Sequence, residues 1–103
     1  MTKVLVGNMS EFDVKGSRKI RVSETDIAVF RLSDNRLLAV ENKCPHKGGL
    51  LSEGMVCGTV VHCPLHDWRI ELTDGRVQEP DTGCVKTFPV EIDRESGSVY
   101  ITI

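Results

Sequence analysis

The stretches of sequence that decide the fold are Cys44-Pro45-His46-Lys47-Gly48-Gly49 and Cys63-Pro64-Leu65-His66. Each stretch brings one thiol and one imidazole close together along the chain, as Cys-x-His in the first and Cys-x-x-His in the second. Ligands spaced so closely must come from tight turns. Two such turns facing each other would form a pocket with four metal ligands, because cysteine and histidine are both ligands that metals bind readily in proteins.

The order of these ligands along the chain, Cys44, His46, Cys63 and His66, separates two kinds of metal centre. Two cysteines and two histidines are compatible with tetrahedral zinc, but zinc fingers usually pair like with like. In a [2Fe–2S] cluster with two cysteines on one iron and two histidines on the other, each turn can give one ligand to each iron. The mixed order therefore favours an iron–sulfur cluster, and a zinc-stapled structural module is the alternative.

The sequence around the two stretches has the alternating pattern of β-strands. Polar and apolar residues alternate over 19–23, and a turn of short polar residues at 33–36 joins two further β-rich segments into a hairpin. The segments expected as strands are 19–23, 25–32, 37–40, 56–63, 68–72, 85–92 and 99–103. Pro89 lies inside one of them and predicts an edge position or a bulge. Short strands with regular turns predict an all-β fold, a small antiparallel sandwich or barrel.

Length and composition exclude several classes of function. A chain of 103 residues predicts a single domain spanning 1–103. The formal net charge is −2 and aromatic residues make up only 5%, so no nucleic-acid partner is expected. The longest apolar run near the start, Val4-Leu5-Val6, is too short for a signal peptide or a membrane span. We therefore expect a soluble, cytoplasmic protein with no membrane partner, in which the four cysteines indicate metal chemistry before a disulfide scaffold.

At the four ligand positions the chain resembles the Rieske family, whose signature is Cys-x-His, a gap of similar length, and Cys-x-x-His. The resemblance implies an antiparallel β fold with two cluster-binding loops and one [2Fe–2S] cluster per chain. It also implies that Cys44 and Cys63 hold the inner iron, and that His46 and His66 hold the outer iron near solvent.

Within this family, the chain is most similar to the small subunit of bacterial NAD(P)H-dependent nitrite reductase. The segments that carry the similarity are Cys44–Gly49, Leu51–Gly54, Cys63–Trp68, Gly83–Val85 and Phe88–Val90. The resemblance implies an electron-transfer subunit, with no substrate site of its own, that works with a large subunit carrying flavin, siroheme and a [4Fe–4S] cluster. That complex reduces nitrite to ammonia in nitrate assimilation. A stand-alone Rieske ferredoxin that passes electrons to an oxygenase is the alternative.

Rieske proteins of membrane complexes differ from this chain at informative positions. They carry a disulfide between cysteines where this chain has Gly49 and Leu65, and hydroxyl donors to the cluster where it has Trp68 and Ile70. Fewer donors stabilise the reduced cluster less, so we expect a reduction potential in the lower part of the range of about −150 to +300 mV. Trp68 is expected to pack beneath the cluster loop.

The remaining cysteines and histidine receive no ligand role. Cys57 and Cys84 lack a ligand-spaced neighbour and are expected to be reduced, partly buried thiols. His62 precedes Cys63, and strand alternation directs its side chain to the opposite face. An exposed docking tip for the redox partner is expected beside the two histidine ligands, flanked by Lys47, Leu50 and Leu51.

Overall fold

The computed structural model describes residues 3–12, 16–22, 24–44, 49–64, 68–78 and 83–103. Its elements in chain order are β1 (Lys3–Asn8), η1 (Met9–Glu11), β2 (Ser17–Val22), β3 (Thr25–Arg31), β4 (Leu37–Glu41), η2 (Leu51–Glu53), β5 (Met55–Cys57), β6 (Val60–His62), β7 (Arg69–Glu71), β8 (Thr87–Phe88), β9 (Val90–Ile92) and β10 (Ser98–Thr102), where η1 and η2 are single 3₁₀ turns. Within the described residues, every strand pairing is antiparallel. The predicted all-β antiparallel fold is thus confirmed.

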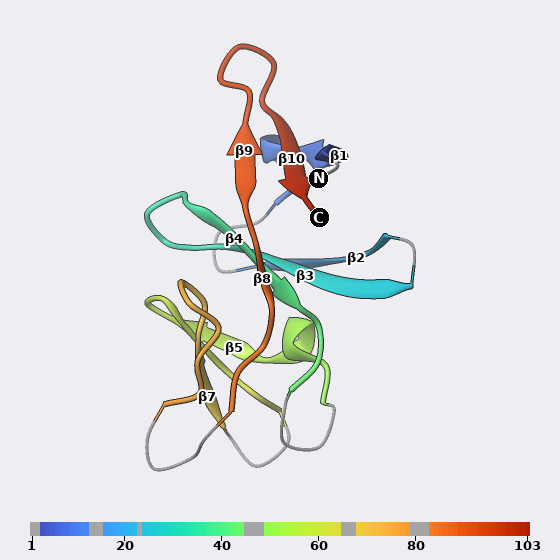
Figure 1. Ribbon diagram of the computed structural model, residues 1–103. Helices are drawn as coiled ribbons and strands as arrows, with labels where there is room; N and C mark the ends of the chain where they lie inside the picture. Colours follow the sequence, from blue (N-terminus) through green and yellow to red (C-terminus); the bar gives the residue numbers. More distant parts are fainter. Residues whose placement is uncertain (1–2, 13–15, 23, 45–48, 65–67, 79–82) are drawn as a thin grey trace.

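The strands form three sheets that follow one another along the molecule (Figure 1). The order is β1-β10-β9 in the first sheet, β2-β3-β4-β8 in the second and β5-β6-β7 in the third. The first sheet contains both ends of the described chain, because β1 pairs with β10. The third sheet lies at the opposite end of the molecule (Figure 1). No helix of the described residues is long and apolar enough to cross a membrane.

The middle sheet separates two hydrophobic cores, and its strand β3 contributes side chains to both. Ala28 and Phe30 belong to the core shared with the third sheet, whereas Ile27 and Val29 belong to the core shared with the first. All four side chains are fully buried. Successive residues of a strand point to opposite faces, so a strand covered on both sides is apolar at successive positions, as β3 is over 27–30. The hairpin of β3 and β4 is the part of the fold that the sequence predicted most closely.

Two of the expected strands are broken in the structure. The segment 56–63 is a hairpin of β5 and β6, whose turn contains Gly58 with a φ of 61°, a value that glycine adopts readily. The segment 85–92 is divided at Pro89, since β8 pairs with β4 whereas β9 pairs with β10. Proline has no amide hydrogen to give to a sheet, so it stands where the chain leaves one sheet for another.

Candidate metal centre

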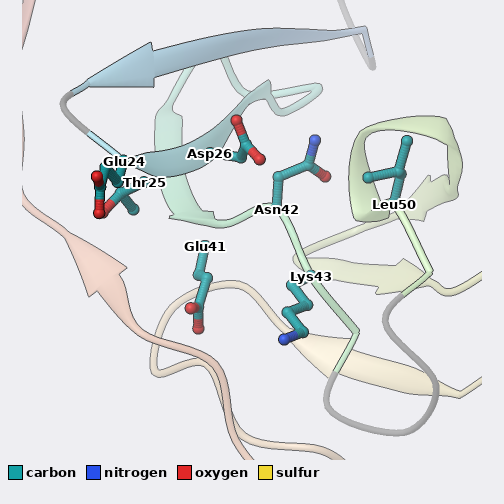
Figure 2. A pocket seen from close by; sticks show the side chains of 7 residues that line it. All are labelled: Glu24, Thr25, Asp26, Glu41, Asn42, Lys43 and Leu50. Carbon is teal, nitrogen blue, oxygen red and sulfur yellow. The ribbon is translucent and has the colours of Figure 1, made fainter.

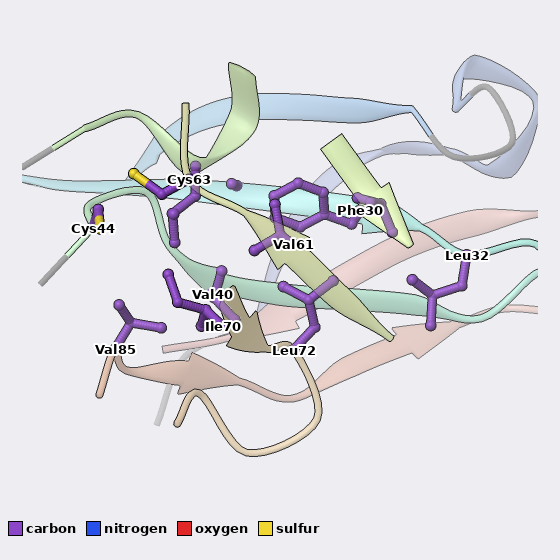
Figure 3. Packing of buried hydrophobic residues seen from close by; sticks show 12 residues of the cluster. Phe30, Leu32, Val40, Cys44, Val61, Cys63, Ile70, Leu72 and Val85 are labelled. Atoms are coloured by element: carbon purple, nitrogen blue, oxygen red, sulfur yellow. The ribbon is translucent and has the colours of Figure 1, made fainter. Parts of the chain in front are cut away.

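Two of the four expected ligands, Cys44 and Cys63, lie in the same buried cluster. Cys44 follows the end of β4 and is 1% exposed, and Cys63 follows the end of β6 and is 2% exposed. Both pack with apolar side chains such as Val61 and Ile70. In Figure 3 the two cysteines lie together at one end of this cluster, with Leu32 at the other. All four cysteines of the chain are described, and none forms a disulfide.

The second ligand loop, residues 63–68, stands in the sequence between the paired strands β6 and β7. Strands β6 and β7 pair in register up to His62 and Arg69, directly before and after the loop. The amide of Cys63 then donates to the carbonyl of Trp68 over 2.7 Å and closes the loop. The indole of Trp68 packs against the core that contains Cys63, as the sequence predicted. A continuous backbone ladder therefore supports this loop.

The first ligand loop, residues 44–49, begins with the same hydrogen bond. The amide of Cys44 donates to the carbonyl of Gly49 over 2.8 Å, again five residues further along the chain. The segments on either side are β4, in the second sheet, and η2, which leads to β5 in the third sheet. Leu51 of η2 is fully buried in the same core as Cys44. The loop thus connects two sheets instead of two paired strands.

The two expected histidine ligands, His46 and His66, lie outside the described residues. Each stands in the sequence between the two residues whose backbone hydrogen bond closes its loop. Among the residues that the structure describes, no three side chains of the ligating types form a metal site. The assignment of the four ligands therefore stays a prediction, of which the structure describes the cysteine half.

The described half of the site fits one end of an iron–sulfur cluster. Two thiols from separate loops reach one buried cluster of apolar side chains, and neither is in a disulfide. Thiolates are the ligands that hold iron–sulfur clusters, and an apolar surrounding limits access of water. Ile70, on β7, is fully buried and has no hydroxyl group. The low reduction potential stays a prediction.

Several expectations about neighbouring residues are wrong in detail. Leu51 cannot flank an exposed docking tip because it is fully buried, although Leu50 is 40% exposed. Lys47 lies outside the described residues. Cys57 and Cys84 were expected to be partly buried, but both are exposed. Cys57 is exposed because it lies on β5 on the opposite face from the buried Val56.

The side chain that the sequence did not predict is Asn42, two residues before Cys44. It is 4% exposed and is the only buried polar side chain in the described part of the chain. It forms part of the wall of a pocket of about 370 Å³ that also includes Lys43 and Leu50 (Figure 2). A single polar residue before a cysteine carries no recognisable pattern, so its burial could not be foreseen.

Comparison with known proteins places this arrangement in a family. Residues 2–89 match the model of the Rieske [2Fe-2S] domain. The 3-phenylpropionate/cinnamic acid dioxygenase ferredoxin subunit of Photorhabdus laumondii is 33% identical, over 100% of this chain and 96% of that protein. A 3-ketosteroid-9-alpha-monooxygenase oxygenase component of Rhodococcus rhodochrous is also 33% identical, over 75% of this chain and 20% of that protein.

Among solved structures, a Mycobacterium tuberculosis protein assigned as an NADH-dependent nitrite reductase small subunit superposes with a TM-score of 0.88. The superposition covers 97% of this chain and 93% of that one, with 21% sequence identity. At this identity the likeness shows the fold alone.

Proposed function

The chain belongs to the Rieske [2Fe–2S] family, and we propose that it is the electron-transfer small subunit of an NAD(P)H-dependent nitrite reductase. Its cofactor is a [2Fe–2S] cluster, which supplies one-electron transfer when bound. The family match sets aside the zinc-stapled module. We further propose that the chain is a single Rieske domain over 1–103, with Cys44, His46, Cys63 and His66 as the ligands.

The proposal rests on the resemblance of five separate sequence segments to nitrite reductase small subunits, and the fold match to a solved structure assigned as one is consistent with it. Four of these segments supply residues of one buried cluster, namely Cys44, Leu51, Cys63 and Val85. The similarity therefore falls on the residues that surround the expected cluster. Overall sequence identity supports the second candidate instead, because a dioxygenase ferredoxin subunit reaches 33% over the whole of this chain.

A stand-alone ferredoxin that serves an oxygenase is the second candidate. The dioxygenase ferredoxin subunit matches the whole of this chain and nearly the whole of that protein, which favours an independent carrier. Both candidates use the same cofactor and fold, and they differ in the catalytic partner. In the first, that partner is a large cytoplasmic subunit with flavin, siroheme and a [4Fe–4S] cluster.

The proposed docking face is the end of the molecule that carries the ligand loops. Electron transfer requires close approach, and two of the large hydrophobic side chains exposed in the described residues lie at this end. Leu50 follows the first ligand loop, and Met55, 76% exposed, lies opposite His62 beside the second. Exposed apolar residues next to a redox centre favour contact with a partner protein.

The test combines the purified chain, loaded with its cluster, with a nitrite reductase large subunit and separately with a dioxygenase and its reductase. We expect nitrite-dependent NAD(P)H oxidation and ammonia formation that require the chain. Leu50→Asp should weaken this activity while the cluster spectrum is kept. Leu5→Asp is the matched control, because Leu5 is 61% exposed on β1, remote from the loops. If the chain supports only the dioxygenase, the second candidate is correct.

A further inference from the structure

The two ligand loops need different kinds of support at their bases. The second loop is held by the β6–β7 ladder, which runs up to His62 and Arg69. The first loop connects different sheets, and no strand pairing joins β4 to η2 among the described residues. Something other than a backbone ladder must fix the ends of the first loop if its ligands are to stay in place.

A reciprocal pair of hydrogen bonds between Asn42 and Ser52 joins those ends. The Ser52 amide donates to Oδ1 of Asn42 over 2.8 Å, and Nδ2 of Asn42 donates to Oγ of Ser52 over 3.0 Å. Oγ of Ser17, on β2, donates to the Ser52 carbonyl over 2.6 Å. In Figure 2 the Asn42 side chain is directed toward the η2 turn, whereas Glu41 and Lys43 are directed away from it.

The burial of Asn42 makes this pair costly to break. A buried amide without partners loses its hydrogen bonds to water and gains nothing in exchange, so the folded chain favours the one arrangement that satisfies it. The backbone amide of Asn42 is also fixed, by a 2.8 Å hydrogen bond to the Asp26 carbonyl of β3. The pair therefore ties η2 to the middle sheet, two residues before Cys44.

We propose that Asn42 is a positioning residue for the cluster, and that the Asn42–Ser52 pair does for the first ligand loop what strand pairing does for the second. The inference rests on the proposed assignment of Cys44 and His46 as ligands. Residues that orient metal ligands without binding the metal themselves typically change metal affinity by about 10- to 100-fold when they are replaced. Breaking the pair should thus weaken retention of the cluster more than it weakens the fold.

The experiment compares Asn42→Ala with Asn8→Ala as a matched control. Asn8 also uses both ends of its amide: Oδ1 accepts from the Ser10 amide over 3.1 Å, and Nδ2 donates to the Ser96 carbonyl over 2.8 Å. Asn8 ends β1, in the sheet remote from the ligand loops. Cluster loss to an iron chelator is followed anaerobically by visible absorbance, and the paramagnetic resonance line width of the reduced protein is recorded alongside.

We expect Asn42→Ala to lose its cluster about 10-fold faster than wild type, with broadened resonance lines. Asn8→Ala should lose its cluster at the wild-type rate, although its thermal stability falls. Ser52→Ala keeps the bond from the Ser52 amide and removes only the hydroxyl, so its rate should be intermediate. If Asn42→Ala does not fold, the rate of cluster loss in Ser52→Ala tests the proposal instead.

Equal rates of cluster loss in Ser52→Ala, Asn42→Ala and Asn8→Ala would overturn the positioning role. Failure of the underlying ligand assignment looks different, because Cys44→Ser would then keep the wild-type spectrum. Neither readout requires a partner protein. The nitrite reductase proposal is therefore tested separately, by the activity assay.

Discussion

The first and second ligand loops both begin at a buried cysteine whose amide donates to a carbonyl five residues further along. They differ in the secondary structure that flanks this hydrogen bond. The second loop closes a hairpin of two paired strands, and the first crosses from one sheet to another. Two loops that begin with the same hydrogen bond can thus be supported by a local backbone ladder or by side chains that meet only in the folded chain.

The largest expected effect is loss of the cluster when one of the proposed cysteine ligands is replaced. The two loops should respond alike. Cys44→Ser and Cys63→Ser should each abolish the [2Fe–2S] cluster, since an iron that loses a thiolate ligand is no longer held. Cys57→Ser is the control, because that thiol is exposed and outside the buried cluster. Iron and acid-labile sulfide analysis measures the outcome. A cluster that survives in one of these variants would show that the cysteine replaced in it is not a ligand.

A large effect on stability is expected beneath the second ligand loop. Ile70 is fully buried and pairs with Val61 behind Cys63. Ile70→Ala should lower the free energy of unfolding by about 2 to 5 kcal/mol, whereas Ile70→Val should cost about 0.5 to 1.5 kcal/mol. Denaturant unfolding of both variants checks this. A loss below about 1 kcal/mol in Ile70→Ala would mean that the hairpin ladder supports the loop without this packing.

A moderate effect is expected in the reduction potential, because neither Trp68, in the second loop, nor Ile70, on β7, has a hydroxyl group to donate to the cluster. The reduced cluster is more negative and gains less from fewer donors. The midpoint should therefore lie below about 0 mV, in the lower half of a range of about −150 to +300 mV. Protein-film voltammetry measures it. A midpoint well above 0 mV would indicate that backbone donors compensate.

The smallest expected effect is a pH-dependent change in stability that comes from Glu11, at the end of the molecule remote from both loops. Hydrogen bonding from the Asn8 amide, and then the Arg18 guanidinium, holds the pKa of Glu11 below its ordinary value of 4.5. A carboxyl with a lowered pKa in the folded state stabilises the fold above its unfolded pKa, and that contribution is lost as the pH falls through the folded pKa.

The stability difference between wild type and Glu11→Gln should therefore shrink on acidification below about pH 4.5. Thermal unfolding across this pH range measures it. The rate of cluster loss at neutral pH should be the same in both proteins. A change in that rate would show that the two ends of the molecule are coupled.

The features that the sequence predicted are those that local patterns determine. Alternation predicted β2, and the polar turn at 33–36 predicted the β3–β4 hairpin, whose strands are neighbours in the chain. The strand β1 was not predicted, since its partner β10 lies at the other end of the sequence. The spacing of cysteines and histidines predicted the two ligand turns, whereas the Asn42–Ser52 pair joins residues that meet only after the sheets assemble.

The central claim is that both loops give one histidine each to a single [2Fe–2S] cluster. Pulsed paramagnetic resonance of the reduced protein, labelled with ¹⁵N-histidine, tests it most directly. The account predicts two histidine nitrogens coupled to the cluster, unchanged in His62→Gln, with the Rieske signal lost in His46→Ala and His66→Ala. A reduced cluster without histidine nitrogen coupling, or stoichiometric zinc without acid-labile sulfide, would contradict it.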